Sequence, residues 1–113
     1  MKIDIQSRDF TAKEDLLAFV TEKVEKLGRF YNDIISSEVL LAVDKSDTND
    51  NKICEIRLVI SGNDLFAKAQ CKSFEEATGD VTDALQRQIE KHKNKIIGKR
   101  KEKSDTIDLL QID

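Results

Sequence analysis

The chain of 113 residues contains no tryptophan and no proline, and it has only four glycines, one tyrosine and one histidine. Such a composition excludes a collagen-like chain or a low-complexity linker, because those sequences are rich in proline or glycine. No apolar run approaches the roughly 18 residues of a membrane span, and the N-terminal residues lack the apolar centre of a signal peptide. We therefore expect one globular domain, located in the cytoplasm and without a membrane partner.

The two cysteines, Cys54 and Cys71, are too few for a disulfide framework. Neither belongs to a Cys-x-x-Cys motif or to a Cys/His cluster with the spacing of metal ligands. The four glycines are isolated from one another, so no glycine-rich loop is present to hold a phosphate group. We expect no metal, no cofactor and no small-molecule substrate.

The sequence also provides little for catalysis. His92 is the only histidine, and local spacing brings no serine or cysteine nucleophile near it. Carboxylates are numerous, but they concentrate at predicted helix starts and in a polar loop, where solvation and the helix dipole explain them. We therefore expect a protein that is not an enzyme and has no catalytic residues.

Positive charge is concentrated near the end of the chain. Residues 84–103, ALQRQIEKHKNKIIGKRKEK, contain eight basic and two acidic residues, whereas the whole chain has a formal net charge of −3. At physiological salt a charge acts mainly on groups within about 8 Å. A cationic surface on this acidic protein can therefore still attract a polyanion.

The first part of the chain predicts a strand and then a helix. Residues Lys2–Ser7 alternate between apolar and polar side chains, which is typical of a half-buried strand. Thr11–Glu14 has the form of a capping box and predicts a helix start, and Gly28 marks the predicted helix end. An apolar stripe lies on one side of this helix and consists of Leu16, Leu17, Val20, Val24 and Leu27.

Three antiparallel strands are predicted next, at Glu38–Val43, Lys52–Ile60 and Leu65–Cys71. A two-residue turn at Gly62–Asn63 fixes the register of the second and third of them. This register places Ile60 opposite Leu65, Leu58 opposite Ala67, Ile56 opposite Ala69 and Cys54 opposite Cys71. Although the cysteines would then be neighbours, free thiols are favoured, because cytosolic disulfides are uncommon and a small thiol suits a buried sheet face.

A second capping box at Ser73–Glu76 predicts the start of a long helix. Its apolar residues recur at every fourth position, at Ala77, Val81, Leu85 and Ile89. Arg87, Lys91 and Lys95 have the same spacing and flank this stripe. The helical pattern decays after Gly98, so we predict a domain over residues 1–98 and a charged, flexible tail over residues 99–113.

These elements follow the order β-α-β-β-β-α. They predict an α+β fold in which two helices pack on one face of a four-stranded sheet. The other face of the sheet is expected to stay exposed to solvent.

The basic stretch allows two interpretations. Cations near a helix C-terminus stabilise the helix dipole, and charged runs are often only solvated surface. One or two cations suffice for the dipole, whereas this stretch holds eight, and Lys23, Lys26 and Arg29 add three more from the first helix. Because of this excess, nucleic-acid binding and a solvated surface remain equal alternatives on the residues alone. Because residues 84–103 contain no aromatic residue, we expect recognition of phosphates and RNA shape without base stacking.

A family resemblance rests on four segments: KIDIQSRDF, FVTEKVEKLGRFYNDI, EIRLVISGNDLFAKAQ and ALQRQIEKHKNKI. Together they resemble the ribosome hibernation promoting factor family, also called ribosome-associated inhibitors or sigma-54 modulation proteins. The resemblance covers residues 1–97, and the Arg-Gln-apolar-x-Lys-x-Lys core of the second helix is its most specific part. It implies the strand and helix order predicted above, in a fold similar to a double-stranded RNA-binding domain.

The resemblance implies a non-enzymatic stress or stationary-phase factor that binds the small ribosomal subunit in the channel between head and body. There it would overlap the mRNA path and the A- and P-site tRNAs, block translation and preserve idle ribosomes. The implied partners are the small subunit with its rRNA and the intact ribosome. By motif position, the rRNA-binding residues are Lys23, Lys26, Arg29, Arg87, Gln88, Lys91, Lys93 and Lys95.

Two features depart from the family pattern. Many relatives begin the second helix with an Asp-Met-Tyr-like segment, whereas this chain has Ser73-Phe74-Glu75, so a tyrosine contact is not carried over to Glu75. Long relatives also append a C-terminal domain that dimerises ribosomes. The residues after the predicted domain are too few for such a domain, so the chain resembles the short form.

Two alternatives stay open at this point. The older family name and the acidic remainder of the chain suggest a protein-interaction module that modulates a transcription factor. Binding to free double-stranded RNA is the other alternative, and it predicts tight binding to a generic duplex. Salt separates protein contacts from phosphate contacts, because only the latter weaken by orders of magnitude as salt rises.

Overall fold

Six elements follow one another along the chain in the order that the sequence predicts. The structure, a computed structural model, describes residues 1–45 and 49–100, with side chains in the last helix as far as Lys93. The elements are β1 (Lys2–Arg8), α1 (Glu14–Phe30), β2 (Ile34–Val43), β3 (Lys52–Ile60), β4 (Asn63–Cys71) and α2 (Phe74–Arg100). The predicted β-α-β-β-β-α fold class is therefore confirmed.

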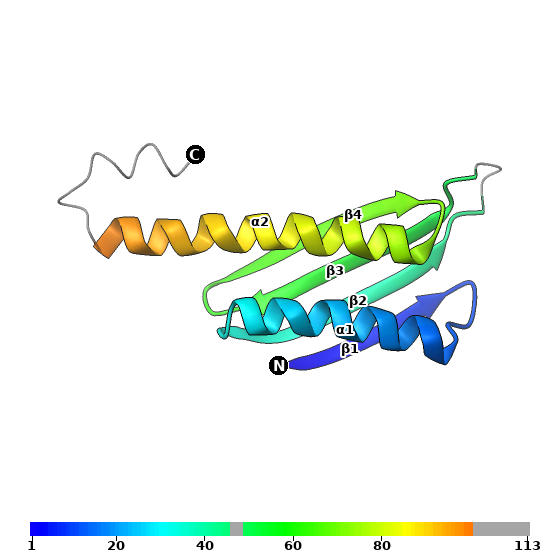
Figure 1. Ribbon diagram of the computed structural model, residues 1–113, viewed down its shortest axis with the longest axis horizontal. Coiled ribbons are helices and arrows are strands. Elements are labelled where there is room, and N and C mark those ends of the chain that lie inside the picture. Colours follow the sequence, from blue (N-terminus) through cyan, green and yellow to red (C-terminus); the bar gives the residue numbers. More distant parts are fainter. Residues whose placement is uncertain (46–48, 101–113) are drawn as a thin grey trace.

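The four strands form a mixed sheet in the order β1-β2-β3-β4. β1 and β2 are parallel and are connected through α1, whereas β2 with β3 and β3 with β4 are antiparallel. Both helices cover one face of the sheet and run in the same direction (Figure 1). Their C-terminal ends therefore lie at the same end of the domain, where α2 extends past the sheet (Figure 1).

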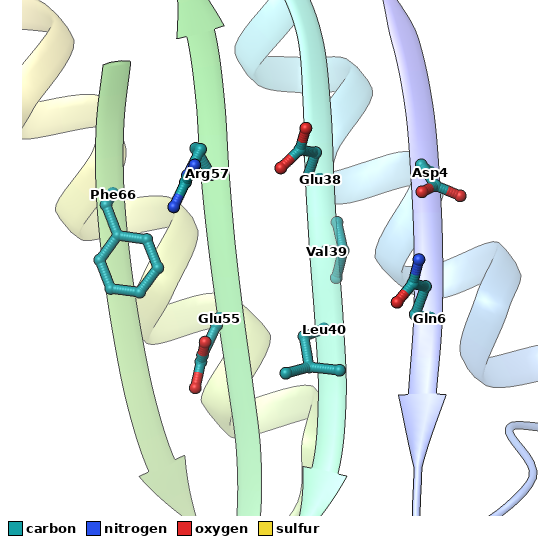
Figure 2. A pocket seen from close by; sticks show the side chains of 8 residues that line it. All are labelled: Asp4, Gln6, Glu38, Val39, Leu40, Glu55, Arg57 and Phe66. Atoms are coloured by element: carbon teal, nitrogen blue, oxygen red, sulfur yellow. The ribbon is translucent and has the colours of Figure 1, made fainter.

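Alternation along the strands gives the sheet two different faces. The face opposite the helices is open and carries polar side chains such as Asp4, Glu38 and Arg57, together with Phe66 (Figure 2). The strand register places Glu38 between Asp4 on β1 and Arg57 on β3. Phe66 on β4 is 47% exposed. One face of the sheet is thus exposed, as predicted.

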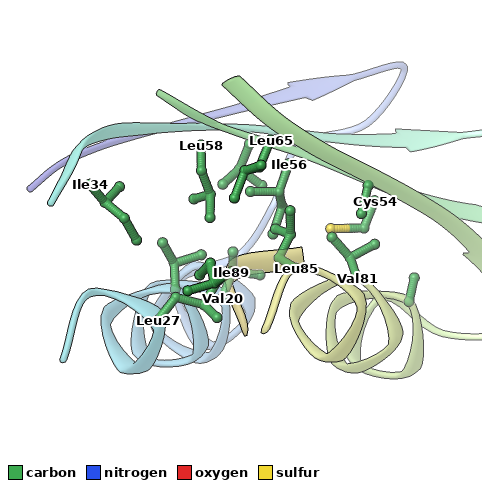
Figure 3. Close-up of a cluster of buried hydrophobic side chains, with 14 of the residues drawn as sticks. Val20, Leu27, Ile34, Cys54, Ile56, Leu58, Leu65, Val81, Leu85 and Ile89 are labelled. Carbon is green, nitrogen blue, oxygen red and sulfur yellow. The ribbon is translucent and has the colours of Figure 1, made fainter. Parts of the chain in front are cut away.

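The other face packs on the two helices and forms the apolar core (Figure 3). Ile56 and Leu58 of β3 and Leu85 and Ile89 of α2 have no exposed surface. All four residues of the predicted α2 stripe are buried: Ala77, Val81, Leu85 and Ile89. In the predicted α1 stripe, Val20, Val24 and Leu27 are buried, whereas Leu16 and Leu17 are half-buried.

The predicted start of the first helix is wrong. α1 begins at Glu14, and the preceding Lys13 makes no side-chain capping hydrogen bond, so the capping box at Thr11 does not form. Phe10 stacks on Phe74 of α2 with ring centroids 4.7 Å apart. This contact holds the chain before α1 against the start of α2, and a local sequence pattern does not contain it.

The predicted end of the first helix is also wrong. α1 continues through Gly28 to Phe30, and the amide of Tyr31 donates to the carbonyl of Leu27 at 2.9 Å. A β-carbon at Gly28 would lie 2.6 Å from the Cε atom of Met1. The glycine therefore provides space for a neighbouring side chain and does not reverse the chain.

The serine of the second capping box does cap α2. Ser73 Oγ accepts a hydrogen bond from the amide of Glu76 at 3.1 Å, and the helix begins at Phe74. The helix continues beyond Gly98 to Arg100, so the first two residues of the predicted tail are helical. The rest of that predicted tail, residues 101–113, lies outside the described residues.

β2 is longer than the sequence predicts. It begins at Ile34, four residues before Glu38, because Ile34 is buried and pairs with Ile60 of β3. The register shifts between Ile34 and Ser36, and Ile35 is 58% exposed. The irregularity makes the first residues of β2 depart from a regular ladder, and the pairing of Ile34 with a distant strand is not contained in the β-forming composition of residues 38–43.

The hairpin of β3 and β4 is shifted by two residues from its predicted register. Ile60 pairs with Asn63, so the turn consists of Ser61 and Gly62, and Gly62 has a φ of 81° that favours glycine. The observed pairs include Leu58–Leu65, Ile56–Ala67 and Cys54–Ala69. The predicted pairs Ile60–Leu65, Leu58–Ala67, Ile56–Ala69 and Cys54–Cys71 are therefore wrong. A two-residue shift nevertheless keeps every side chain on its predicted face, because strand side chains alternate with a period of two.

Both cysteines are free thiols, as predicted. Cys54 is fully buried, and burial raises its pKa to about 11, although a hydrogen bond from the Thr78 hydroxyl opposes this shift. The pKa of Cys71 is also raised, first by desolvation and then by its hydrogen bond to the Asp80 carboxylate at 3.3 Å. Both thiols therefore resist ionisation at neutral pH.

The raised pKa of Cys54 predicts a loss of stability in alkaline solution. The native protein keeps this proton up to about pH 11, whereas the unfolded chain loses it near the ordinary value of 9.0. The free energy of unfolding should therefore fall as pH rises through this range, by roughly 2 to 3 kcal/mol at its upper end. Urea unfolding measures this fall in the protein and in a Cys54→Ala variant. An equal fall in both proteins would show that Cys54 does not cause it.

Candidate nucleic-acid interface

The residues predicted to bind RNA lie in the C-terminal halves of α1 and α2, which are at the same end of the domain (Figure 1). Residues 22–30 carry three basic and two acidic side chains, and residues 84–95 carry four basic and one acidic. Their net charges are therefore +1 and +3 on a chain whose total is −3. We call these two helical segments the basic end of the domain.

On α1, the basic side chains differ in exposure. Lys26 and Arg29 are exposed, whereas Lys23 is half-buried with its ammonium group 5.5 Å from the centre of the Phe19 ring. This distance is typical of a cation–π contact. Val24 and Leu27 pack in the core and hold this part of the helix on the sheet, so Lys26 and Arg29 remain available to solvent.

On α2, Arg87 and Lys91 are exposed and lie about one helical turn apart. Leu85 and Ile89 of the same helix are fully buried against the sheet. Their burial fixes the rotation of α2 about its axis and places Arg87 and Lys91 on the solvent side. The side chain of Lys95 lies outside the described residues.

Lys93 connects the two helices. Its ammonium group donates to the backbone carbonyl of Phe30 at 3.4 Å and lies 4.5 Å from the centre of the Phe30 ring. Phe30 is the last residue of α1, where unpaired carbonyls form the negative end of the helix dipole, so a cation is stabilising there. Lys93 therefore makes a structural contact in addition to its predicted RNA contact.

Gln88 also has a partner within the protein. Its side-chain nitrogen donates to the backbone carbonyl of Phe66 at 2.9 Å. Phe66 lies on β4, which is an edge strand of the sheet, so this hydrogen bond satisfies a carbonyl that no neighbouring strand reaches. The second N–H and the oxygen of the Gln88 amide remain available for another ligand.

A hollow of about 390 Å³ on the open face of the sheet has a different character (Figure 2). Its lining includes the carboxylates of Asp4, Glu38 and Glu55 and one guanidinium group, that of Arg57. Lys68 forms an ion pair with Glu55 at 3.7 Å. Carboxylates outnumber cations in this lining, so the hollow is poorly suited to a polyanion, and the basic end of the domain is the better candidate for RNA.

The described part of the chain offers little for other kinds of site. Among its His, Cys, Asp and Glu side chains, no group of three or more could hold a metal ion. His92 packs edge-on against Tyr31, with ring centroids 5.9 Å apart. No helix in residues 1–45 and 49–100 is long and apolar enough to cross a membrane.

The fold brings aromatic side chains next to α2 of the basic end, and the sequence pattern does not predict their presence there. Residues 84–103 contain no aromatic residue, but the parallel packing of the helices brings Tyr31 beside His92 and Lys93. The only available signal was the position of Phe30 and Tyr31 directly after Arg29. Their proximity to α2 depends on a contact between residues about sixty positions apart, which spacing along one helix cannot reveal.

The fold and the basic end together define a small β-α-β-β-β-α domain in which the C-terminal segments of both helices carry a net positive charge. Residues 3–97 match the model of the family described as Sigma 54 modulation protein / S30EA ribosomal protein. The chain therefore belongs to this family, and the resemblance found in the sequence is confirmed.

Two relatives with known names are similar over most of their length. The ribosome hibernation promoting factor of Azotobacter vinelandii is 32% identical over 97 residues, which cover 86% of this chain and 87% of that protein. The protein of the same name from Escherichia coli strain K12 is 31% identical over 97 residues, which cover 85% of this chain and 97% of that protein.

Two solved structures share the fold. A ribosomal subunit interface protein from Coxiella burnetii has a TM-score of 0.74 at 16% identity, covering 82% of this chain and 98% of that chain. The N-terminal domain of Thermus thermophilus Protein Y has a TM-score of 0.68 at 18% identity, covering 79% of this chain and 96% of that chain. At such low identity these two structures support the fold alone.

Proposed function

We propose that this protein is a cytoplasmic ribosome hibernation factor that binds the small ribosomal subunit through its basic end. It occupies the channel between head and body, where mRNA and the A- and P-site tRNAs bind. By doing so it blocks translation and preserves inactive ribosomes under stress or in stationary phase. Its partners are the small subunit with its rRNA and the intact ribosome. Membership of the family and the names of the two relatives support this function.

Four exposed cations support this function most directly. Lys26 and Arg29 on α1 and Arg87 and Lys91 on α2 lie in the two helical segments that meet at one end of the domain (Figure 1). Arginine binds phosphate with two parallel hydrogen bonds, and lysine binds it as a point charge. A pair of helices that presents both residue types is suited to the irregular phosphate surface of folded RNA.

The other predicted RNA-binding residues complete the proposed interface. Lys23 and Lys95 extend it along α1 and α2 respectively. Gln88 and Lys93 are assigned both an RNA contact and the contacts with Phe66 and Phe30 that they already make. Through these contacts Gln88 is held relative to β4 and Lys93 relative to α1, so both side chains would contact RNA from fixed positions.

The proposed mechanism requires occupancy and no chemical step. A domain bound in the channel excludes mRNA and tRNA, because they need the same space. Both helices are anchored in one apolar core, so the backbone positions that carry their cations are fixed relative to one another before binding. Such preorganisation reduces the conformational entropy lost on binding and increases affinity.

Co-sedimentation with purified small subunits over a salt series tests this function. We expect saturable binding to small subunits and to intact ribosomes that weakens steeply between 50 and 200 mM salt. With about five phosphate contacts, the affinity should fall roughly 100- to 1,000-fold over that range. An in vitro translation assay should show inhibition in proportion to the fraction of ribosomes that carry the protein.

Three other outcomes would contradict the proposed function. Absence of binding to small subunits at low salt would contradict the proposal that the protein acts on this subunit. Binding that changes little with salt would indicate protein contacts, as expected of a module that modulates a transcription factor. Equally tight binding to a generic RNA duplex would indicate a protein that binds double-stranded RNA without preference for the ribosome.

A further inference from the structure

A hollow of about 350 Å³ lies where α1 ends and β2 begins. Glu25, Arg29, Tyr31 and Asn32 provide its polar and aromatic lining, and Met1 contributes an apolar side chain. None of these residues has a place in the phosphate interface described above except Arg29. The hollow is therefore a separate feature that shares one residue with the basic end.

The position of Met1 in this hollow depends on Gly28. A β-carbon at Gly28 would lie only 2.6 Å from the Cε atom of Met1, so an alanine would displace the methionine side chain. Glycine within a helix costs about 1 kcal/mol relative to alanine. Gly28 destabilises the helix in this sense, but its lack of a side chain lets the apolar side chain of Met1 lie across the last turns of α1.

The lining combines the groups that a nucleotide needs. A tyrosine ring offers a surface for stacking a base, and such stacking tolerates any base because every base has a π-face. The exposed Asn32 amide both donates and accepts hydrogen bonds, and the exposed Glu25 carboxylate accepts them from a base amino or imino group. The exposed Arg29 guanidinium is suited to the phosphate of the same nucleotide.

The hollow adjoins the basic end through Tyr31. The Tyr31 ring packs at 79° against His92, with centroids 5.9 Å apart, and the Lys93 ammonium group lies 5.9 Å from the Tyr31 ring centre. Tyr31 therefore contacts α2 and also lines the hollow. An RNA strand with phosphates on the basic end could place an adjacent unpaired base in the hollow without a second, distant site.

We propose that this hollow binds one unpaired nucleotide of single-stranded RNA. The base packs against Tyr31, its edge meets Asn32 and Glu25, and its phosphate meets Arg29. The only donor on the pairing edge of uracil is N3–H, which lies between two carbonyl oxygens that repel a carboxylate, so bases with an exocyclic amino group should bind better than uracil. The site rests on the proposed function and deepens it, since it adds base contact to an interface that the sequence predicts to recognise phosphates and shape alone.

Intrinsic fluorescence provides a direct test, because Tyr31 is the only tyrosine and the chain has no tryptophan. We expect ten-nucleotide oligocytidine to quench the Tyr31 emission and oligouridine to quench it less at equal concentration. An abasic ribose-phosphate decamer should leave the emission unchanged. N-acetyltyrosinamide in matched solutions corrects for light absorbed by the RNA. Equal emission with oligocytidine and with the abasic decamer would overturn the proposal.

Free cytidine monophosphate distinguishes a strand from a mononucleotide as the ligand. It lacks the neighbouring phosphates that the basic end would hold, so it should quench Tyr31 only at a concentration at least about 100-fold higher than the oligomer. Quenching at an equal concentration would assign the hollow to a free nucleotide and contradict an RNA strand as its ligand.

Substitutions separate this site from the proposed function. Tyr31→Leu keeps an apolar side chain but removes the ring, and it should weaken binding to small subunits about 5- to 100-fold with an unchanged salt slope. Tyr31→Phe should stay within about twofold of the parent, and Phe66→Leu, which removes a ring on the opposite face, should have no effect. Asn32→Ala should weaken binding without any change of the thermal midpoint, because Asn32 is exposed.

Failure of the proposed function and failure of the nucleotide site give different results. If the parent protein binds no small subunits, the proposed function fails. If the parent binds and a folded Tyr31→Leu variant binds equally well, the function stands and the nucleotide site is overturned. Thermal unfolding of each variant shows whether it is folded at the assay temperature, and the Asn32→Ala result remains informative if Tyr31→Leu is not.

Discussion

Simultaneous replacement of Arg87, Lys91 and Lys95 by glutamate is expected to abolish binding to the small ribosomal subunit. Each cation is proposed to contact RNA phosphate, and a hydrogen bond to a charged group contributes roughly 1.5 to 3 kcal/mol. Loss of three such contacts corresponds to about 1,000-fold or more in affinity, before the added repulsion between carboxylates and phosphates is counted. Co-sedimentation at low and moderate salt measures the loss.

The same variant is expected to fold. Arg87 and Lys91 are exposed, and the buried face of α2, formed by residues such as Leu85 and Ile89, is unchanged. Three acidic groups in the second half of α2 interact unfavourably with the helix dipole, but this effect is modest on a solvated helix. Circular dichroism and the thermal midpoint should therefore remain close to those of the parent protein.

A matched control separates local charge from total charge. Replacement of Arg8, Lys13 and Lys72 by glutamate changes the net charge by the same amount, and all three side chains are exposed. Arg8 is the last residue of β1, and Lys13 and Lys72 come just before the starts of α1 and α2, so none belongs to the basic end. We expect this control to bind small subunits nearly as well as the parent. Equal loss in both variants would show that binding follows net charge, and full binding by the first variant would exclude α2 as the interface.

Side-chain periodicity predicted which residues face the core, even where the predicted pairing was wrong. The hairpin turn is at Ser61–Gly62, one position earlier than predicted, and this moves β3 and β4 by two residues relative to each other. Ile56 and Leu58 still face the helices, because a two-residue shift restores the same face. The sequence therefore determined the faces of the sheet more securely than its individual pairs.

Element ends were predicted less well because tertiary contacts set them. A capping box at Thr11 is a sound local signal, but Phe10 stacks on Phe74 and the helix starts later. Gly28 is a common helix-ending residue, yet here it provides space for Met1 inside the helix. In each case the deciding partner lies far away in the chain, so no window of neighbouring residues contains the information.

In the candidate site, too, some features follow from the local sequence and others depend on contacts between distant residues. Excess basic residues on α1 and α2 were evident from composition, since charge needs no knowledge of distant contacts. The contacts of Lys93 with Phe30 and of Gln88 with Phe66 were not, because each joins residues from different elements. Tyr31 lies beside α2 of the basic end only because the helices pack in parallel (Figure 1). Sequence identified the charged residues, and the fold distinguishes those that are free from those that already have partners.

Replacement of Leu85 by alanine is expected to cause a large loss of stability. Leu85 has no exposed surface and packs between α2 and the sheet (Figure 3). Truncation of a buried leucine to alanine costs about 2 to 5 kcal/mol, because it removes apolar contacts and leaves a cavity. Domains of this size have total stabilities of roughly 5 to 15 kcal/mol, so the thermal midpoint should fall by about 10 °C or more.

Gln86→Ala is the matched control for this substitution. Gln86 is adjacent to Leu85 but exposed, and its change to alanine should alter the free energy of unfolding by less than about 0.5 kcal/mol. At temperatures well below its midpoint, Leu85→Ala should still bind small subunits with near-parental affinity, because its cations are unchanged. Stability of Leu85→Ala equal to that of Gln86→Ala would show that α2 does not pack on the sheet through this face. The orientation of Arg87 and Lys91 toward solvent, on which the proposed interface depends, would then be wrong as well.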